Sequence, residues 1–327
     1  MNGRRWAALI IAGGLFLVSI AYQIATTKES NVYGNLIGGE MFEEHIMKEG
    51  TGEHKIAVVP LDGAIQDLTD SPLAAGYNHK EFLNMLDQAG SDPFVDGVII
   101  RVNSPGGGVV ESAEIHDKVV DIQEQYEKPV YVSMGNTAAS GGYYVAAPAD
   151  KIVAHPATLT GSIGVIMESI NISEFADNHG IDFQTIKSGK HKDILSMSRD
   201  MTEDEEKILQ SMIDEMYEDF VDVIVAGRDM PEDEVKKISD GRVYTGKQAY
   251  ELDLVDELGS LEDTIAMLEE DYQLNDAIVV QYEQAFGLSN FFSMSFNEMF
   301  RSDVDLQEVV NTLRSTDGPR AMYLYTE

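Results

Sequence analysis

Short apolar runs alternate with amphipathic stretches between residues 55 and 275. The apolar runs are rich in Val and Ile and are bounded by glycine or charged residues, which is typical of buried strands. Amphipathic stretches with helical spacing follow several of them. We expect strands at 55–60, 95–102, 129–134, 151–154 and 182–186, and helices at 80–89, 110–127, 141–147, 173–178 and 202–227. This order predicts an α/β domain whose mostly parallel sheet is covered by helices.

The longest amphipathic stretch, residues 202–227, has clear start and stop signals. Thr202 and Glu205 have the spacing of a capping box, and Gly227 stands at the end. Apolar residues repeat along one face of this stretch, as Ile208, Met212, Met216, Phe220 and Val223. The stripe needs a partner, which is either the domain's own core or a neighbouring subunit.

The N-terminus differs from the rest of the chain. Arg4 and Arg5 precede an uncharged stretch, residues 6–25, that is long enough to cross a bilayer. A cleavable signal peptide is the alternative, because residues 19–21 (Ser-Ile-Ala) have the small-x-small form of a cleavage site. The length favours a retained single-pass anchor in the cell membrane. The two arginines predict a cytoplasmic N-terminus and an extracytoplasmic catalytic domain.

The composition shifts along the chain predict four segments. Residues 1–27 form the membrane anchor, and the polar, glycine-containing residues 28–54 form a linker. Residues 55–275 form the α/β domain. Residues 276–327 form a C-terminal extension that either packs on the domain or is a flexible tail.

Composition narrows the chemistry. The chain has no cysteine, which excludes disulfides, a thiolate nucleophile and thiolate metal ligands. Residues 28–327 hold 21 of the 23 basic residues and all 57 acidic ones, a net charge of −36. This charge argues against nucleic acid as a partner, because phosphate binding needs clustered Lys and Arg. It also suits a protein that works in brine, a hypothesis that requires the melting temperature to rise between dilute buffer and molar salt.

Two glycine-rich segments carry the most informative chemistry. Ser140 lies in the segment 138–144, Ala-Ala-Ser-Gly-Gly-Tyr-Tyr, at an expected helix start. Glycine after a nucleophile lets a substrate approach the backbone, and free amides at a helix start stabilise an oxyanion. The segment 104–108, Ser-Pro-Gly-Gly-Gly, follows an expected strand and could supply a second donor. Each segment alone is more typical of a turn or a tight packing contact.

Together with 160–165 (Thr-Gly-Ser-Ile-Gly-Val) and 188–193 (Ser-Gly-Lys-His-Lys-Asp), these segments resemble the signal peptide peptidase A family, membrane-anchored serine proteases of the ClpP/crotonase superfamily. The resemblance covers about residues 56–268. It implies a ClpP/crotonase-like core of repeated ββα units, with Ser140 as nucleophile and the backbone amides of Gly107 and Gly141 as the oxyanion hole. It also implies a homo-oligomer, a ring or dome whose active sites face an interior.

A serine nucleophile needs a base, and the residues alone leave the base open. None of the seven histidines lies in a pattern that identifies a triad. Lys187, Lys190 and Lys192 are alternatives if burial keeps one of them partly neutral. The resemblance selects Lys192, with Lys190 second. It also implies that Ser162 hydrogen-bonds and orients the lysine, whereas a turn serine is the ordinary interpretation of Ser162.

The expected activity is that of a Ser/Lys endopeptidase that hydrolyses cleaved signal peptides and other membrane-associated hydrophobic peptides. Two extended edges are expected to pair with the substrate, formed by Gly108, Val109 and Val110 and by Ile163, Gly164 and Val165. The alternatives are a crotonase-type acyl-CoA enzyme, which an exported acidic domain disfavours, and a catalytically idle membrane scaffold. We expect no cofactor and no metal, because His-Glu-x-x-His is missing and the acidic run 203–206 is typical of a solvated helix start.

Overall fold

The computed structural model describes residues 42–67, 77–284 and 321–325, and the predicted anchor lies outside them. The chain forms two units, and the larger, residues 44–282 with 287–327, contains every contact discussed below. Among the described residues, no helix is both long and apolar enough to span a bilayer. The principal sheet runs in the order β1-β10-β2-β3-β5-β6-β9. Its strands are β1 (Phe42–Lys48), β2 (Lys55–Asp62), β3 (Gly97–Ser104), β5 (Val130–Ala139), β6 (Lys151–Ala154), β9 (Glu257–Leu258) and β10 (Ile278–Gln284).

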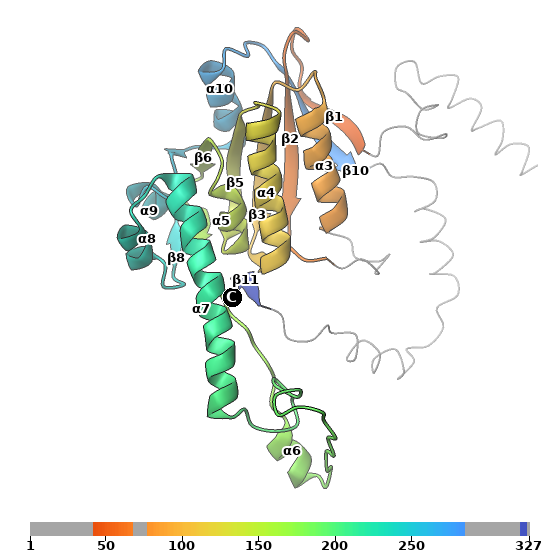
Figure 1. Cartoon of the computed structure of the whole chain (residues 1–327). Coiled ribbons are helices and arrows are strands. Elements are labelled where there is room, and N and C mark those ends of the chain that lie inside the picture. The colour runs from red at the N-terminus through yellow and green to blue at the C-terminus, as the bar shows by residue number, and fades with distance from the viewer. Residues whose placement is uncertain (1–41, 68–76, 285–320, 326–327) are drawn as a thin grey trace, which may run out of the picture. The chain divides into compact units, whose positions relative to one another are not determined.

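The four central strands are parallel, which confirms the predicted α/β class. Helices α3 (His79–Ser91) and α4 (Val109–Gln125) cover one face of the sheet (Figure 1). Alternate residues of β2 and β3, such as Ile56 and Ile99, pack instead against α10 (Leu261–Asp271) through Ile265 and Leu268. A sheet buried on both faces explains why its strands appear in the sequence as continuous apolar runs.

Short elements gather at the carboxyl ends of these strands. They are β4 (Gly106–Gly108), α5 (Gly141–Ala146), β7 (Leu159–Gly161), β8 (Val243–Thr245) and α9 (Gly246–Glu251). β7 pairs in parallel with the end of β5 and antiparallel with β8. A capping box of Thr245 and Gln248 starts α9. The carboxyl ends of parallel strands are the usual place for ligand sites in such sheets.

The long helix α7 (Glu203–Arg228) begins at the predicted capping box of Thr202 and Glu205 and is followed by α8 (Glu232–Ile238). Its C-terminal part packs on the domain through Phe220, Val221 and Ile224, so the apolar stripe meets the domain's own core there. Its N-terminal part carries residues 167–201, which we call the arm. The arm contains α6 (Ser173–Asn178) and lies around the far end of α7, away from the sheet (Figure 1).

Several expectations need correction. Residues 182–186 form no strand, because they are exposed in the arm and have no neighbouring strand to pair with. Val109 and Val110 begin helix α4, so the predicted extended edge at 108–110 is wrong beyond Gly108. β1 lies within the segment predicted as a linker. The C-terminal extension supplies two strands, β10 in the main sheet and β11 (Met322–Leu324), which pairs with β4. The helices predicted at 80–89, 110–127, 141–147, 173–178 and 202–227 are confirmed to within two residues at each end.

Candidate active site

Ser140 occupies a sharp turn between β5 and α5. Its φ of 53° and ψ of −119° are unusual for a residue with a side chain, and such strain is typical of functional sites. The Gly161 carbonyl accepts a hydrogen bond from the Ser140 amide (2.7 Å), and the Ser140 carbonyl accepts from the Tyr143 and Tyr144 amides. These bonds hold the turn in place. The Ser140 Oγ is buried and has no hydrogen-bond partner among the described residues.

The two predicted oxyanion glycines lie side by side next to Ser140. A Cβ atom built on Gly141 would lie 3.1 Å from the Gly107 nitrogen and 2.5 Å from Ser112 Oγ. A Cβ atom on Gly107 would overlap the carbonyl oxygen of Ile65. Residue 65 also fixes the β4 backbone, donating to Gly106 and accepting from Gly108, both at 2.8 Å. Both positions therefore have no room for a side chain, as close approach of backbone to a ligand requires.

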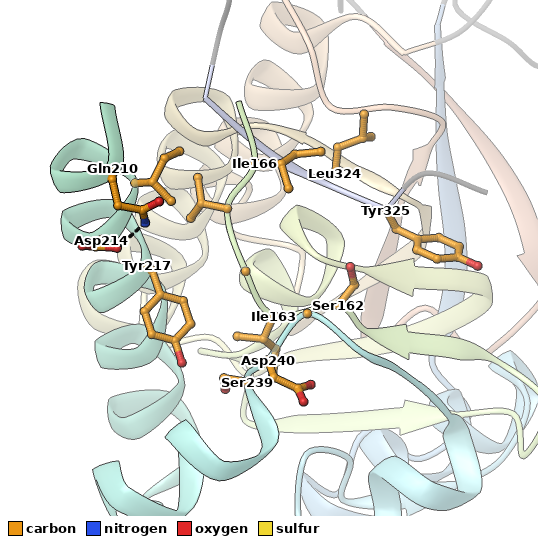
Figure 2. Close-up of a pocket in the computed structure, with 14 residues that line it drawn as sticks. Ser162, Ile163, Ile166, Gln210, Asp214, Tyr217, Ser239, Asp240, Leu324 and Tyr325 are labelled. Carbon is orange, nitrogen blue, oxygen red and sulfur yellow. Dashed lines mark hydrogen bonds between the residues drawn. The ribbon is translucent and has the colours of Figure 1, made fainter. Parts of the chain in front are cut away.

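Ser162 follows β7 in the way that Ser140 follows β5. Ala139 and Gly161 are partners in the β5–β7 register, so the two serines leave adjacent strands at neighbouring points. Ser162 also has a positive φ, 51°, and its amide donates to the Arg242 carbonyl at 2.8 Å. Ser162, Ile163, Gly164 and Val165 line a pocket of about 540 Å³, together with α7 residues such as Tyr217 (Figure 2).

The chain's own C-terminal segment lies on this site as an added strand. β11 pairs antiparallel with β4, with Tyr323 opposite Gly107, and Met322 bridges to Ile166 on the other side. The Tyr325 amide donates to the Pro105 carbonyl at 2.8 Å. A Cβ atom on Gly106 would overlap the Tyr323 carbonyl oxygen and lie 2.6 Å from the Gly141 nitrogen. The Tyr323 carbonyl therefore lies close to the oxyanion glycines.

The Tyr323 side chain fills an aromatic pocket beside Ser140. It stacks on Tyr144, with ring centroids 5.0 Å apart, and contacts Phe220 of α7 at 4.7 Å. Its hydroxyl donates to the Met216 carbonyl at 3.0 Å. Burial raises the pKa of Tyr144 to about 12 and also raises the pKa of Tyr323, so both rings stay neutral at physiological pH. Leu324 and Tyr325 reach the adjoining pocket that Ser162 lines (Figure 2).

The three candidate lysines lie together in the arm but differ in their partners. Lys187 pairs with Asp193 at 2.6 Å, and Lys190 pairs with Asp204 at 2.7 Å. The ammonium of Lys192 is exposed and has no carboxylate partner among the described residues. An ammonium held by a carboxylate is less free to approach a second site, so ion pairing occupies Lys187 and Lys190. This comparison favours Lys192 independently of any resemblance.

Lys192 and Ser140 are far apart within one chain. Lys190 is tied to Asp204 at the start of α7, whereas Phe220 of the same helix packs on Tyr144, in the helix that follows Ser140. From Glu203 to Phe220 an α-helix rises about 25 Å, at about 1.5 Å per residue. The arm therefore holds Lys192 on the order of 25 Å from the serine.

Comparison with known proteins shows the family to which the chain belongs. The model of the family described as "Peptidase family S49" matches residues 122–275. A protein of Enterococcus faecium named "Putative signal peptide peptidase SppA" is 39% identical over 99% of both chains. The chain belongs to peptidase family S49. It is therefore a serine peptidase.

Other relatives extend the comparison. "Protease 4" of Salmonella typhi is 35% identical over 64% of this chain and 34% of its own length. "Serine protease SPPA, chloroplastic" of Arabidopsis thaliana is 29% identical over 83% of this chain and 41% of its own. Among solved structures, a ClpP1 mutant from Listeria monocytogenes aligns with a TM-score of 0.42 and 18% identity, over 63% of this chain and 92% of that chain.

Sequence reasoning missed three parts of this S49 peptidase site. Ser112 is buried behind Gly141, and its hydroxyl donates to the Gly108 carbonyl at 2.8 Å. Tyr323 lies far from the motifs in the sequence and has no local pattern to mark it. Arg199 organises the arm through contacts that exist only in the folded chain. One of its partners, Glu205, belongs to the capping box with Thr202, which the sequence did predict.

Proposed function

We propose that the protein is an endopeptidase in which Ser140 and Lys192 form the catalytic dyad. The observation that supports this most strongly is the Ser140 turn. Its backbone is strained, its hydroxyl has no partner among the described residues, and it lies beside Gly107 and Gly141, where β11 pairs with β4. Neutral Lys192 takes the proton as Ser140 Oγ attacks the scissile carbonyl. The oxyanion accepts hydrogen bonds from the amides of Gly107 and Gly141.

The remaining steps use the same residues. The protonated Lys192 gives its proton to the leaving amine, which leaves an acyl ester on Ser140. A water molecule, deprotonated by the same lysine, then hydrolyses that ester. Ser162, on the loop next to Ser140, is the residue that orients the lysine amine in this proposal.

The dyad requires that Lys192 come from a neighbouring copy of the chain. The long helix α7 and the ion pairs at its start keep the arm away from the Ser140 of its own chain. A homo-oligomer, arranged as a ring or dome, brings the arm of one copy onto the site of the next. Large apolar side chains that the arm exposes, among them Ile170, Phe175 and Ile186, provide apolar area for this contact.

We propose that the substrates are hydrophobic peptides bound as added strands, including cleaved signal peptides. The name of the Enterococcus faecium relative supports this class. The C-terminal strand provides a second argument, because it pairs with backbone groups of β4, and its one deep side chain enters an aromatic pocket. Backbone pairing gives affinity with little dependence on sequence, and we expect aromatic side chains to be preferred in the position of Tyr323.

The predicted fold family and location complete the proposal. A repeated ββα core like that of ClpP and crotonase accounts for the two units in which Gly107 and Ser140 lie between a strand and the helix that follows it. Residues 1–27 serve as a single-pass membrane anchor that keeps the peptidase domain extracytoplasmic, close to peptides left in the bilayer. No observation favours acyl-CoA chemistry or a scaffold.

The test compares wild type, Ser140→Ala and Lys192→Ala on a peptide with a signal-like hydrophobic centre, using the chain from residue 28 onward in high salt. Cleavage by wild type and none by either folded variant supports the dyad. Activity of Lys192→Ala shows that another residue is the base. Activity of Ser140→Ala shows that the nucleophile lies elsewhere.

A further inference from the structure

The loop that carries Lys192 is organised by one arginine. Residues 187–200 contain neither a helix nor a strand, and most of their side chains are at least partly exposed, so hydrophobic packing does little to fix their shape. Arg199 makes six hydrogen bonds there. A guanidinium with this many partners has a defined orientation, because its five N–H groups form a rigid planar fork.

One side of this fork holds the residue after Lys192. Arg199 Nε and Nη2 donate to the two carboxylate oxygens of Asp193, at 3.0 and 2.7 Å, and Nη2 also donates to the Asp193 backbone carbonyl at 3.2 Å. Lys187 adds a third donor to the same carboxylate. These bonds lower the pKa of Asp193, so it stays ionised well below neutral pH. The backbone next to Lys192 is therefore fixed through both the side chain and the main chain of Asp193.

The other side of the fork holds the first turn of α7. Arg199 Nη1 and Nη2 donate to the two carboxylate oxygens of Glu205, at 2.9 and 2.7 Å. Glu205 is only 2% exposed, and it also accepts from the amide and hydroxyl of Thr202 in the capping box. The acidic run 203–206 is thus no uniformly solvated helix start, because one of its carboxylates is a buried anchor.

Helix α7 connects this anchor to the wall of the active site. Its other end packs on Tyr144 through Phe220, and its Met216 carbonyl accepts from Tyr323. A helix is stiff over this length, so the position of Lys192 depends on how the loop is joined to the helix start. Arg199 bonds to both, and it does so beside the ion pairs of Lys190 with Asp204 and of His191 with Glu205.

We propose that Arg199 is a positioning residue for Lys192: its paired bonds to Asp193 and Glu205 hold the loop on the start of α7, so that the amine reaches the Ser140 of the neighbouring copy at a fixed point. This inference rests on the dyad proposed above. Arg199 has a second effect, because its positive charge compensates the carboxylates of Asp193, which follows Lys192, and of Glu205, at the start of α7. The other charged groups of this region are Lys187, Lys190 and His191 of the arm and Asp204 of α7.

The test uses the full chain with Arg199→Met and Arg199→Lys. We expect Arg199→Met to lower kcat on the order of 100-fold with KM nearly unchanged, because a displacement of about 1 Å costs this much. We also expect the acidic limb of its pH–rate profile to move to higher pH, because the uncompensated carboxylates stabilise the lysine ammonium. Arg199→Lys keeps the charge, so it should restore the wild-type pH profile. Its kcat should stay low, because an ammonium cannot make the paired bonds of a guanidinium to both carboxylates.

Lys236→Met is the matched control. Lys236 also bridges two carboxylates, Glu218 and Glu232, but it joins α7 to α8 away from the arm. We expect the control to keep wild-type kcat and pH profile. Equal losses of kcat in Arg199→Met and Lys236→Met, or a wild-type kcat and pH profile in Arg199→Met, would overturn the proposal.

Lys192→Ala, measured in parallel, separates the two levels of inference. If Lys192→Ala is inactive and Arg199→Met behaves as wild type, the dyad stands and the role of Arg199 is wrong. If Lys192→Ala is active, both fall. If Arg199→Met loses the fold of the arm, as shown by rapid proteolysis within residues 167–201, the decision passes to Arg199→Lys: a normal kcat in that variant overturns the role of the fork.

Discussion

The backbone of Ser140 is strained in a way that its proposed role as nucleophile explains and the stability of the fold does not. The combination of φ 53° and ψ −119° suits glycine, and another residue held there costs about 1–3 kcal/mol. Hydrogen bonds from the Ser140 amide and to its carbonyl hold the turn, and the result is a hydroxyl next to the amides of Gly107 and Gly141. A serine kept in such a conformation indicates selection for the position of its Oγ.

We therefore predict opposite orders of stability at two serines. Ser140→Gly should be more stable than Ser140→Ala by about 1 kcal/mol, because glycine relieves the strain, although both lack activity. At Ser211, an exposed residue within α7, the glycine variant should be less stable than alanine by about 1 kcal/mol. Chemical denaturation of the four variants measures this. The same order at both positions would contradict the strain argument.

Gly107 has a different requirement, which is space. A methyl group there would overlap the Ile65 carbonyl, so Gly107→Ala must displace β4 and the oxyanion donor that it carries. We predict that kcat/KM falls about 100- to 1000-fold, the usual cost of losing one such donor. Gly97→Ala, at the opposite end of β3, would meet the flexible Leu268 side chain at 3.1 Å and make an ordinary contact with Pro129 at 3.5 Å, so it should keep its activity. Near-normal kcat/KM in folded Gly107→Ala would remove Gly107 from the site.

At the residue scale, local chemistry could be predicted and long-range contacts could not. Ser140, Gly107 and Gly141 stand in short motifs whose turns and helix start follow from glycine, and the structure brings all three together. The residues alone left the choice among the lysines open and the resemblance selected Lys192, whereas the ion pairs of Lys187 and Lys190 are an argument that only the fold reveals. Arg199 has no motif, because its role arises from partners on either side of a turn.

At the scale of elements, the position of the β11 strand bears on how a substrate can enter the candidate active site. It covers β4 along Gly106, Gly107 and Gly108, the edge at which a substrate strand would have to pair. Tyr323 also occupies the aromatic pocket of Tyr144 and Phe220. A segment of the same chain competes at an effective concentration that reaches the millimolar range. We therefore expect the strand to compete with the substrate.

We predict that removal of residues 321–327 lowers the apparent KM about tenfold, because the peptide no longer has to displace β11. kcat should change little, since Ser140 and the oxyanion amides remain. Steady-state kinetics on one hydrophobic peptide measures both quantities. Tyr250→Ala, an exposed tyrosine of α9, serves as the control and should leave KM unchanged. An unchanged or higher KM in the truncated protein would show that β11 does not compete.

Elements also show where pattern reasoning fails. The apolar runs that became β2, β3, β5 and β6 were recognisable because both faces of the sheet are covered. Ile181 and Phe183 alternate with polar residues and Ile186 follows three positions later, yet all three are exposed in the arm and pair with no described strand. Alternation of apolar and polar residues indicates that one face of a segment is buried. It does not indicate whether that face is buried within the chain or against another copy. This explains the incorrect strand at 182–186.

At the scale of the whole molecule, the proposed dyad requires an assembly, because Ser140 and Lys192 are far apart within one chain. The net charge of −34 makes copies of the chain repel one another at low ionic strength, and this repulsion is screened within about 3 Å in molar salt. In the proposed assembly, the exposed apolar side chains of the arm supply the attraction. Activity should consequently depend on assembly, and salt should favour both.

Mixing two inactive variants tests the shared site directly. If Lys192 of one copy serves Ser140 of the next, Ser140→Ala and Lys192→Ala chains exchanged in equal amounts in molar salt should recover about a quarter of wild-type activity. The fraction follows from chance, because a site needs an intact serine from one copy and an intact lysine from its neighbour, each present in half of the chains. Equal mixing of Ser140→Ala with Lys192→Ala/Ser140→Ala is the control and should recover none. If the first mixture stays inactive although labelled subunits are shown to exchange, each chain must complete its own site, and the arm must swing about 25 Å to reach it.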